Sequence, residues 1–88
     1  MEKRCFTIKN RLGLHARAAA QLVQTASQFG SEIVIGKDGE EVNGKSIMGI
    51  LMLAAAQGTE IVVQVTGDDA GKAIEAIGKL IEDGFGEE

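Results

Sequence analysis

The spacing of the apolar residues switches between two periods along this chain, and the order of the switches limits the folds open to it. Alternating apolar and polar residues predict strands, and apolar residues three or four apart predict helices. In chain order, the predicted elements are a strand over Arg4–Ile8, a helix over Ala16–Phe29, strands over Glu32–Gly36 and 41–43, a helix from Ile47 to about Ala55, a strand over Thr59–Thr66 and a last helix whose apolar stripe runs from Ala73 to Ile81. The strands alternate rather than forming continuous apolar runs. This βαββαβα order therefore predicts an α+β fold, with an antiparallel sheet exposed to water on one face and covered by helices on the other.

Turn-forming and capping residues separate these segments. Gly30 follows the first helix as a C-terminal stop, and the Asp-Gly pair at 38–39 favours a tight hairpin turn. Ser46 is placed to cap the second helix, Gly58 to close it, and one of the two Asp residues at 68–69 to cap the last helix. The chain contains no Pro and no low-complexity linker, so we expect one domain over residues 1–88.

Charge and hydropathy exclude several classes of protein. The formal net charge is -4, and the basic residues are scattered singly, which disfavours nucleic acid as a partner. The longest apolar run, Ile50 to Ala56, is far shorter than the roughly 20 residues that span a bilayer, and the first ten residues lack the apolar core of a secretory signal. We therefore expect a cytoplasmic, monomeric protein without membrane insertion.

The single cysteine limits the redox and metal chemistry that the chain can support. One Cys excludes an internal disulfide and a cysteine-built metal site, and a single His offers no second imidazole ligand. We expect no cofactor and no metal. Cys5 lies in the first alternating segment, where a small buried or half-buried thiol is expected rather than a reactive one.

His15, the one histidine, stands where the first helix should begin. Ser, Thr, Asp and Asn are the usual residues at this position, and His is a poor substitute, which is a local cost often found at functional sites. The first N–H groups of a helix have no intrahelical partner, so those of Ala16, Arg17 and Ala18 offer donors to a phosphate. The positive end of the helix also disfavours an imidazolium ring and leaves a nitrogen free to attack.

Arg17 lies in the first turn of the same helix, where the helix dipole opposes a cation. Its guanidinium becomes useful if an anion occupies the site periodically. The alternatives are a surface His beside an Arg with no chemical role, a metal site, which lacks ligands, and a hydrolase, which lacks a nucleophile, base and orienting group. Together, His15 and Arg17 favour a histidine that carries phosphate.

Two segments resemble a known family. Gly13-Leu14-His15-Ala16-Arg17, followed by an Ala-rich helix, resembles the active-site segment of HPr, the histidine-containing phosphocarrier of the bacterial phosphotransferase system. Asn43-Gly44-Lys45-Ser46-Ile47-Met48-Gly49-Ile50 resembles the regulatory-serine region of that family at the matching distance. The resemblance covers essentially the whole chain and implies the HPr-like open-faced β-sandwich, with a four-stranded antiparallel sheet and three helices on one face.

The resemblance also implies a relay. Enzyme I, which draws on phosphoenolpyruvate, would phosphorylate a ring nitrogen of His15, and the group would pass to an enzyme II A-type protein with support from Arg17. The protein would then be a phosphocarrier and not an independent catalyst. The family usually has Pro after the Arg, where this chain has Ala18. Ala is the best helix former and restores an N–H, so we expect the helix to form with a less rigid site.

Two interpretations remain open for Ser46 and for the apolar residues that follow it. Ser46 is either a helix cap alone or, by resemblance, also the target of a serine kinase whose phosphate lowers phosphoryl acceptance at His15. Ile47, Met48, Leu51 and Met52 are either packed in the core or exposed for partner docking; docking is favoured for Ile47 and Met48, and core packing for Leu51.

The sequence supports two possible functions, which belong to different classes of protein. The first is a phosphocarrier in sugar uptake or in a parallel nitrogen-linked branch. The second is a regulatory module that uses the same surface to bind a transcription factor or an enzyme without carrying phosphate. A purely regulatory relative could dispense with His15, so its presence beside Arg17 favours the carrier.

Overall fold

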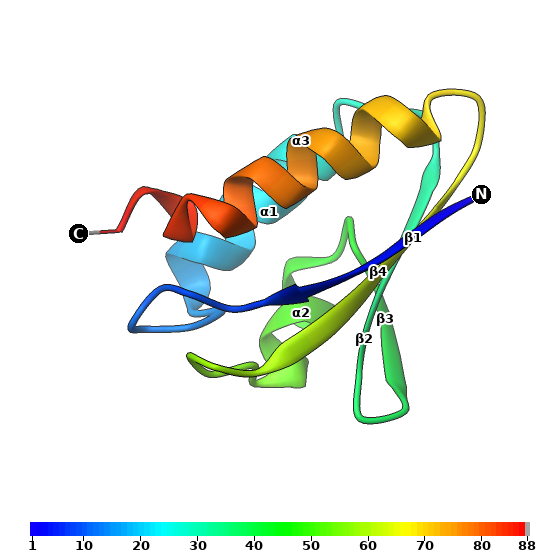
Figure 1. The fold of residues 1–88 in the computed structure, drawn as a ribbon. Coiled ribbons are helices and arrows are strands. Elements are labelled where there is room, and N and C mark those ends of the chain that lie inside the picture. The colour runs from blue at the N-terminus through cyan, green and yellow to red at the C-terminus, as the bar shows by residue number, and fades with distance from the viewer. Residues whose placement is uncertain (88) are drawn as a thin grey trace.

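The computed structural model describes residues 1–87, and its elements follow the predicted βαββαβα order. They are β1 (Glu2–Thr7), α1 (Ala16–Ala26), β2 (Glu32–Lys37), β3 (Glu40–Asn43), α2 (Ile47–Leu53), β4 (Glu60–Thr66), α3 (Ala70–Glu82) and a short 3-10 helix, η1 (Gly84–Gly86). The strands form one sheet in the order β1-β4-β2-β3, and every neighbouring pair is antiparallel. The helices lie on one side of this sheet (Figure 1), as the alternating strands predicted.

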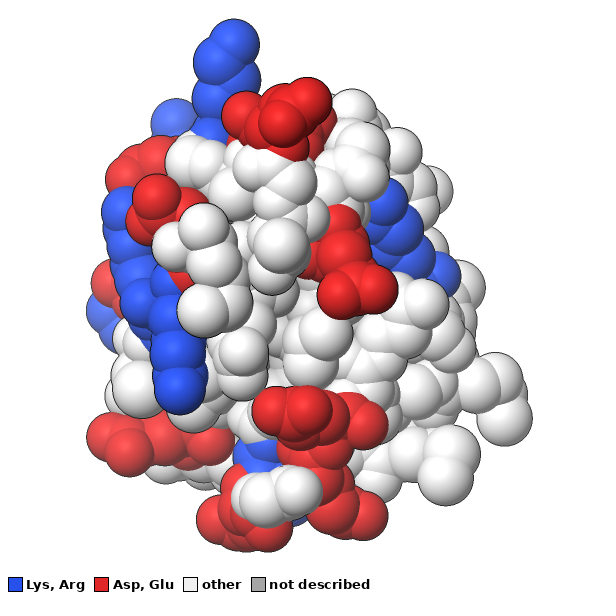
Figure 2. All heavy atoms as spheres, turned by 90° about the vertical axis from the view of Figure 1, so that its right-hand side faces the viewer, with Lys and Arg blue, Asp and Glu red and all other residues white. Residues whose placement is uncertain are grey.

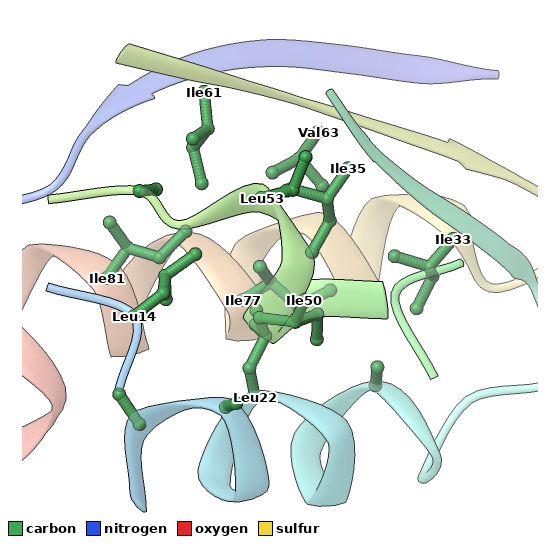
Figure 3. Close-up of a cluster of buried hydrophobic side chains, with 14 of the residues drawn as sticks. Leu14, Leu22, Ile33, Ile35, Ile50, Leu53, Ile61, Val63, Ile77 and Ile81 are labelled. Atoms are coloured by element: carbon green, nitrogen blue, oxygen red, sulfur yellow. The ribbon is translucent and has the colours of Figure 1, made fainter. Parts of the chain in front are cut away.

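The core lies between the sheet and the helices. The inward residues of β4 are fully buried, as expected from their alternation, and Ile33 and Ile35 of β2 face the same way. Each helix contributes at least one fully buried side chain: Leu22 from α1, Ile50 from α2 and Ile77 from α3. These three converge at the centre of the core, below the residues from the sheet (Figure 3). Because all three helices share this core, the N-terminus of α1 has a fixed position relative to α2 and α3.

Two helices end earlier than their apolar spacing predicted. α1 ends at Ala26 rather than Phe29, because the N–H groups of Gln28 and Phe29 bond to carbonyls only three residues back and tighten the last turn. α2 ends at Leu53, since Ala54 adopts the left-handed conformation with φ 51°. Gly58 therefore does not close α2; it lies in the turn before β4, and its N–H bonds to the carbonyl of Ile8 at 2.8 Å.

The expectation that Cys5 is buried or half-buried was wrong. β1 pairs only with β4 and forms an edge of the sheet, and its alternation directs Phe6 toward α3, where Gly78 leaves room for the ring. Cys5 consequently belongs to the opposite face, which no helix covers, and is exposed.

The surface carries mixed charge. On the face shown in Figure 2, basic side chains gather mainly along one margin and lie beside acidic ones, without a continuous basic area. No helix in residues 1–87 has the length and apolar character needed to cross a membrane.

Asp69 connects the start of α3 to the loop between α1 and β2. It occupies the N-cap position, but within the described residues its side chain makes no capping bond to α3. Its carboxylate instead accepts the N–H of Gly30 at 3.0 Å and the N–H of Ser31 at 3.1 Å, and it also accepts the Ser31 hydroxyl proton. These three bonds favour the charged carboxylate, with the Ser31 hydroxyl contributing most, and lower the pKa of Asp69.

We expect the Asp69→Asn variant to be less stable than the wild type at neutral pH, with the difference vanishing in acid. The native pKa of Asp69 lies below its unfolded value of about 4, so the stabilisation is complete above that value and is lost as pH falls through the native pKa. Urea unfolding of both proteins between pH 2 and pH 7 measures the difference. Equal stabilities at pH 7, or a gap that widens in acid, would contradict this assignment.

Candidate functional site

His15 occupies the N-cap position of α1, as predicted. Its backbone is extended (φ -77°, ψ -179°), and in the part of the chain described here its side chain makes no capping bond. The first intrahelical bond runs from the N–H of Ala19 to the carbonyl of His15 at 2.8 Å, so the N–H groups of residues 16–18 precede the intrahelical ladder. The imidazole is 31% exposed, which leaves the ring accessible to a second protein.

The loop before His15 is held against the end of α2. The N–H of Leu14 bonds to the carbonyl of Ala55 at 2.9 Å, and the Leu14 side chain is buried. Gly13 has φ +66°, and a Cβ at this position would lie 2.4 Å from the Ala55 carbonyl oxygen. The buried side chain of Asn10 donates to the carbonyl of Gly13 at 2.8 Å. The position of the imidazole is therefore set by the loop packing and not by a capping bond.

His15 and Arg17, which the sequence analysis paired, line one surface hollow of about 290 Å³. Arg17 is exposed at its rim, whereas Ala18 is fully buried, so the residue in place of the usual Pro packs into the core. The complete lining consists of Leu12, His15, Arg17, Ala18, Gln21, Phe85, Gly86 and Glu87. The hollow is therefore formed by the start of α1 together with a segment from the other end of the chain.

Glu87 is a member of this site that the sequence analysis missed. After α3, residues 84–86 all have positive φ and turn the chain back toward the loop that carries His15 (Figure 1). The Glu87 carboxylate lies 3.4 Å from His15 Nε2 and accepts the N–H of Leu12 at 3.0 Å and the side-chain amide of Asn10 at 3.2 Å. The Gly-Phe-Gly sequence indicates a turn, but no pattern in the sequence predicts that this turn brings Glu87 to a histidine 72 residues before it.

The surroundings of Glu87 favour its charged form. Desolvation by burial acts to raise its pKa, but the bonds from Asn10 and the Leu12 N–H, with the His15 ring nearby, outweigh this effect and leave the pKa below the ordinary value. The hollow thus contains a carboxylate, an imidazole and a guanidinium within one small volume.

The second predicted region lies at α2. Ser46 is its N-cap, as predicted, and its hydroxyl accepts the N–H of Gly49 at 3.1 Å. The side chains of Ile47, Met48 and Met52 are 42%, 69% and 75% exposed. We call these three residues the α2 patch. Leu51 is half-buried and packs against the core, the position that its sequence favoured, so it is not counted in this exposed patch.

Within residues 1–87, no group of three or more His, Cys, Asp or Glu side chains is arranged to hold a metal ion.

The comparisons with known proteins agree with this fold. Residues 2–83 match the family described as "PTS HPr component phosphorylation site". A phosphocarrier protein HPr from Neisseria meningitidis is 52% identical over 87 residues, covering 99% of this chain and 98% of the relative. The crystal structure of HPr-C-His from Thermoanaerobacter tengcongensis is 51% identical, with a TM-score of 0.97 over 100% of this chain and 99% of that one.

A more distant structural neighbour bears a regulatory name. The catabolite repression protein Crh of Bacillus subtilis, described as a swapped dimer, is 37% identical, with a TM-score of 0.77 over 94% of this chain and 95% of that one. The Neisseria and Thermoanaerobacter similarities extend over nearly the full chain and place it among the phosphocarrier proteins. The chain belongs to the HPr family of the bacterial phosphotransferase system.

Proposed function

We propose that His15 accepts a phosphoryl group from phosphorylated enzyme I and transfers it to enzyme II A-type proteins. The observation that carries this proposal is the position of His15: a partly exposed imidazole at the N-terminus of α1, with no capping bond in the described chain. A ring nitrogen attacks phosphorus, the bond between phosphorus and the donor breaks, and the electron pair leaves with the donor. The second transfer reverses these roles, and the ring becomes the leaving group.

The other residues of the hollow supply positioning and charge, which is most of what phosphoryl transfer requires. The N–H groups of residues 16–18 point out of the positive end of α1 and donate to phosphoryl oxygens. Arg17 adds a guanidinium that lines the same hollow and balances the charge of the phosphoryl group. The protein needs no cofactor for this chemistry and acts as a carrier between two enzymes.

The α2 patch is the proposed docking surface for these partners. Its exposed Met and Ile side chains adapt to more than one partner, as flexible apolar surfaces do. Ser46 is adjacent, and phosphorylation by a serine kinase would add about 1.5 to 2 negative charges to this surface. We propose that such a modification weakens docking and so lowers phosphoryl acceptance at His15.

The Met48→Ala variant should raise the KM of enzyme I for this protein about 5- to 30-fold with little change in kcat. The substitution removes an exposed docking contact and leaves His15 and its hollow unchanged. Steady-state phosphorylation at varied carrier concentration measures both constants. Lys72→Ala, at an exposed position on α3, is the control and should retain the wild-type KM. A wild-type KM for Met48→Ala would exclude Met48 from the interface.

The remaining proposals concern the oligomeric state, the domain organisation and the cellular location of the protein. We propose that the carrier acts as a monomer, whereas the related Crh is described as a swapped dimer. The family match from residue 2 to residue 83 supports one domain over 1–88. A cytoplasmic location follows from the proposed exchange with the enzymes of the relay.

The test of this function combines the purified protein with enzyme I and labelled phosphoenolpyruvate. We expect one label per chain, labile in acid and stable in base, as a phosphoramidate is, with transfer to an added enzyme II A-type protein. The second candidate is a regulatory module that binds a transcription factor or an enzyme without carrying phosphate, and the catabolite-repression name of the related Crh supports a regulatory role. An unlabelled protein that still binds a partner would support that candidate and overturn the first.

A further inference from the structure

We infer that Met48 and Met52 form an oxidation site: a hydroperoxide converts their thioethers to sulfoxides, and the oxidised α2 patch docks enzyme I more weakly until a sulfoxide reductase restores it. The oxidation itself depends only on the exposure of these two residues. Its effect on phosphoryl acceptance rests on the proposed function and adds a form of regulation to it.

The chain places its methionines outside the core. In residues 1–87 none of the three methionines is buried, and Met48 and Met52 are 69% and 75% exposed. The residues of α2 that enter the core are Ile50 and Leu53 (Figure 3). An oxygen atom added to either sulfur therefore disturbs no core packing, and no methionine lines the His15 hollow in the described chain. We expect the oxidised protein to keep its fold and its phosphoryl acceptor.

The two thioethers are neighbours on the helix surface. Met48 and Met52 are four residues apart on α2, a spacing that places them one turn apart on the same face. With Ile47 they make up the α2 patch, so oxidation changes two of its three side chains. Because both residues are exposed, an oxidant reaches them without any opening of the fold. Most of the patch is therefore converted from apolar to polar by one reagent.

The surface around the α2 patch has little charge that could compensate for a new polar group. Residues 46–59 contain no Asp, Glu, Lys or Arg, and residues 12–31 contain only Arg17 among these types. These two segments are adjacent in the fold, since α1 packs against α2. Lys45 precedes the patch, but its ammonium group donates to the carbonyl of Phe29 at 2.7 Å. Docking at the patch therefore depends on apolar contact, which a sulfoxide weakens because its oxygen loses water on burial.

The reaction transfers one oxygen atom and two electrons. A sulfur lone pair attacks the outer oxygen of the hydroperoxide, the S–O bond forms and the O–O bond breaks. The proton of the transferred hydroxyl moves to the leaving oxygen, which departs as water when the oxidant is hydrogen peroxide. The sulfur is oxidised and the peroxide is reduced. Methionine sulfoxide reductases reverse the change, with one enzyme for each epimer of the sulfoxide.

The test treats the purified full chain with hydrogen peroxide, removes the oxidant with catalase and follows two readouts. Peptide mass analysis measures the oxidation of each methionine, and we expect Met48 and Met52 to react about as fast as they do in the urea-unfolded chain. Steady-state phosphorylation by untreated enzyme I should then show a KM raised about 10- to 100-fold with little change in kcat. Methionine sulfoxide reductases should return the KM to its value before oxidation.

The matched variant is Met48→Leu/Met52→Leu, which keeps the patch apolar and has no thioether there. Its KM is compared with its own value before treatment, and we expect peroxide to leave that value unchanged. The variant retains Met1 and Cys5, which are both exposed, so it also measures what oxidation elsewhere contributes.

The outcomes separate the two proposals. Slow oxidation of Met48 and Met52 in the folded chain, or an unchanged KM once both are oxidised, would overturn this inference and leave the carrier function intact. An equal rise in KM in the double variant would assign the effect to Met1 or Cys5 and would also overturn it. Absence of label on the untreated wild type would overturn the proposed function, whereas the peptide masses need no phosphoryl donor and still test the oxidation.

Discussion

The His15→Ser variant is expected to lose all acid-labile label from enzyme I while becoming slightly more stable than the wild type. The chain has one His, so no other imidazole can accept the phosphoryl group. In the described structure His15 makes no capping bond to α1, whereas Ser is a favoured N-cap whose hydroxyl reaches the free N–H groups of the first turn. We expect a gain of about 0.5–1 kcal/mol in the free energy of unfolding, measured by urea denaturation.

The N-cap of α2 provides the matched comparison for the His15→Ser variant of α1. Ser46 already caps α2 through the N–H of Gly49, so Ser46→Ala should lose about 1 kcal/mol. Opposite signs for the two variants would show that α1 lacks a stabilising cap at the position where function requires His. Residual acid-labile label on His15→Ser would contradict the role of His15 as the phosphoryl acceptor. A loss of stability in that variant would contradict the missing cap on α1. The His15→Ala variant should also be unlabelled, without the gain in stability.

The Gly13→Ala variant should lose about 2–4 kcal/mol of unfolding free energy and most of its phosphoryl acceptance at temperatures where it remains folded. The new Cβ would lie 2.4 Å from the Ala55 carbonyl oxygen and 2.9 Å from Ala56 Cα, and the backbone has a φ of +66° that Ala disfavours. The new Cβ would meet backbone atoms of Ala55 and Ala56, which no side-chain rotation can move away, so the loop must move to relieve the contact. That movement displaces His15, which follows Gly13 by two residues. Denaturation and enzyme I labelling of the same preparation measure the two effects.

Gly71 is the control for this substitution. It lies in the first turn of α3, and an added Cβ would have no described atom within 4 Å apart from its chain neighbours and the backbone of its own helix. Gly71→Ala should therefore gain up to about 1 kcal/mol through helix propensity and retain full labelling. If both Gly variants behaved alike, the close contact between Gly13 and Ala55 could not be what positions His15.

The elements whose periodicity is strong were predictable from the sequence. The alternation of Ile61, Val63 and Val65 set the inward face of β4, and the stripe from Ala73 to Ile81 set the buried face of α3. The N-cap position of His15 also followed from the sequence, because the Ala-rich segment after it has a clear helical start. These predictions depend on local patterns, and each such pattern lies within a short stretch of the sequence.

Features that depend on packing between distant segments were not predictable. The contact of Glu87 with His15 results from three consecutive positive φ angles after α3, including one at Phe85, which is buried although Phe rarely adopts this conformation. The end of α2 follows from a left-handed Ala54 in a place where Gly is usual. The exposure of Cys5 depends on β1 lying at the sheet edge, which an alternating pattern does not specify.

The strand order has a consequence for synthesis of the protein on the ribosome. β4 lies between β1 and β2, yet it is the last strand to be translated. Until residues 60–66 leave the exit tunnel, the nascent chain has only the β2–β3 hairpin, and β1 has no partner. We therefore expect the sheet to assemble in one late step rather than strand by strand, which leaves the unpaired β1 segment available to chaperones throughout elongation.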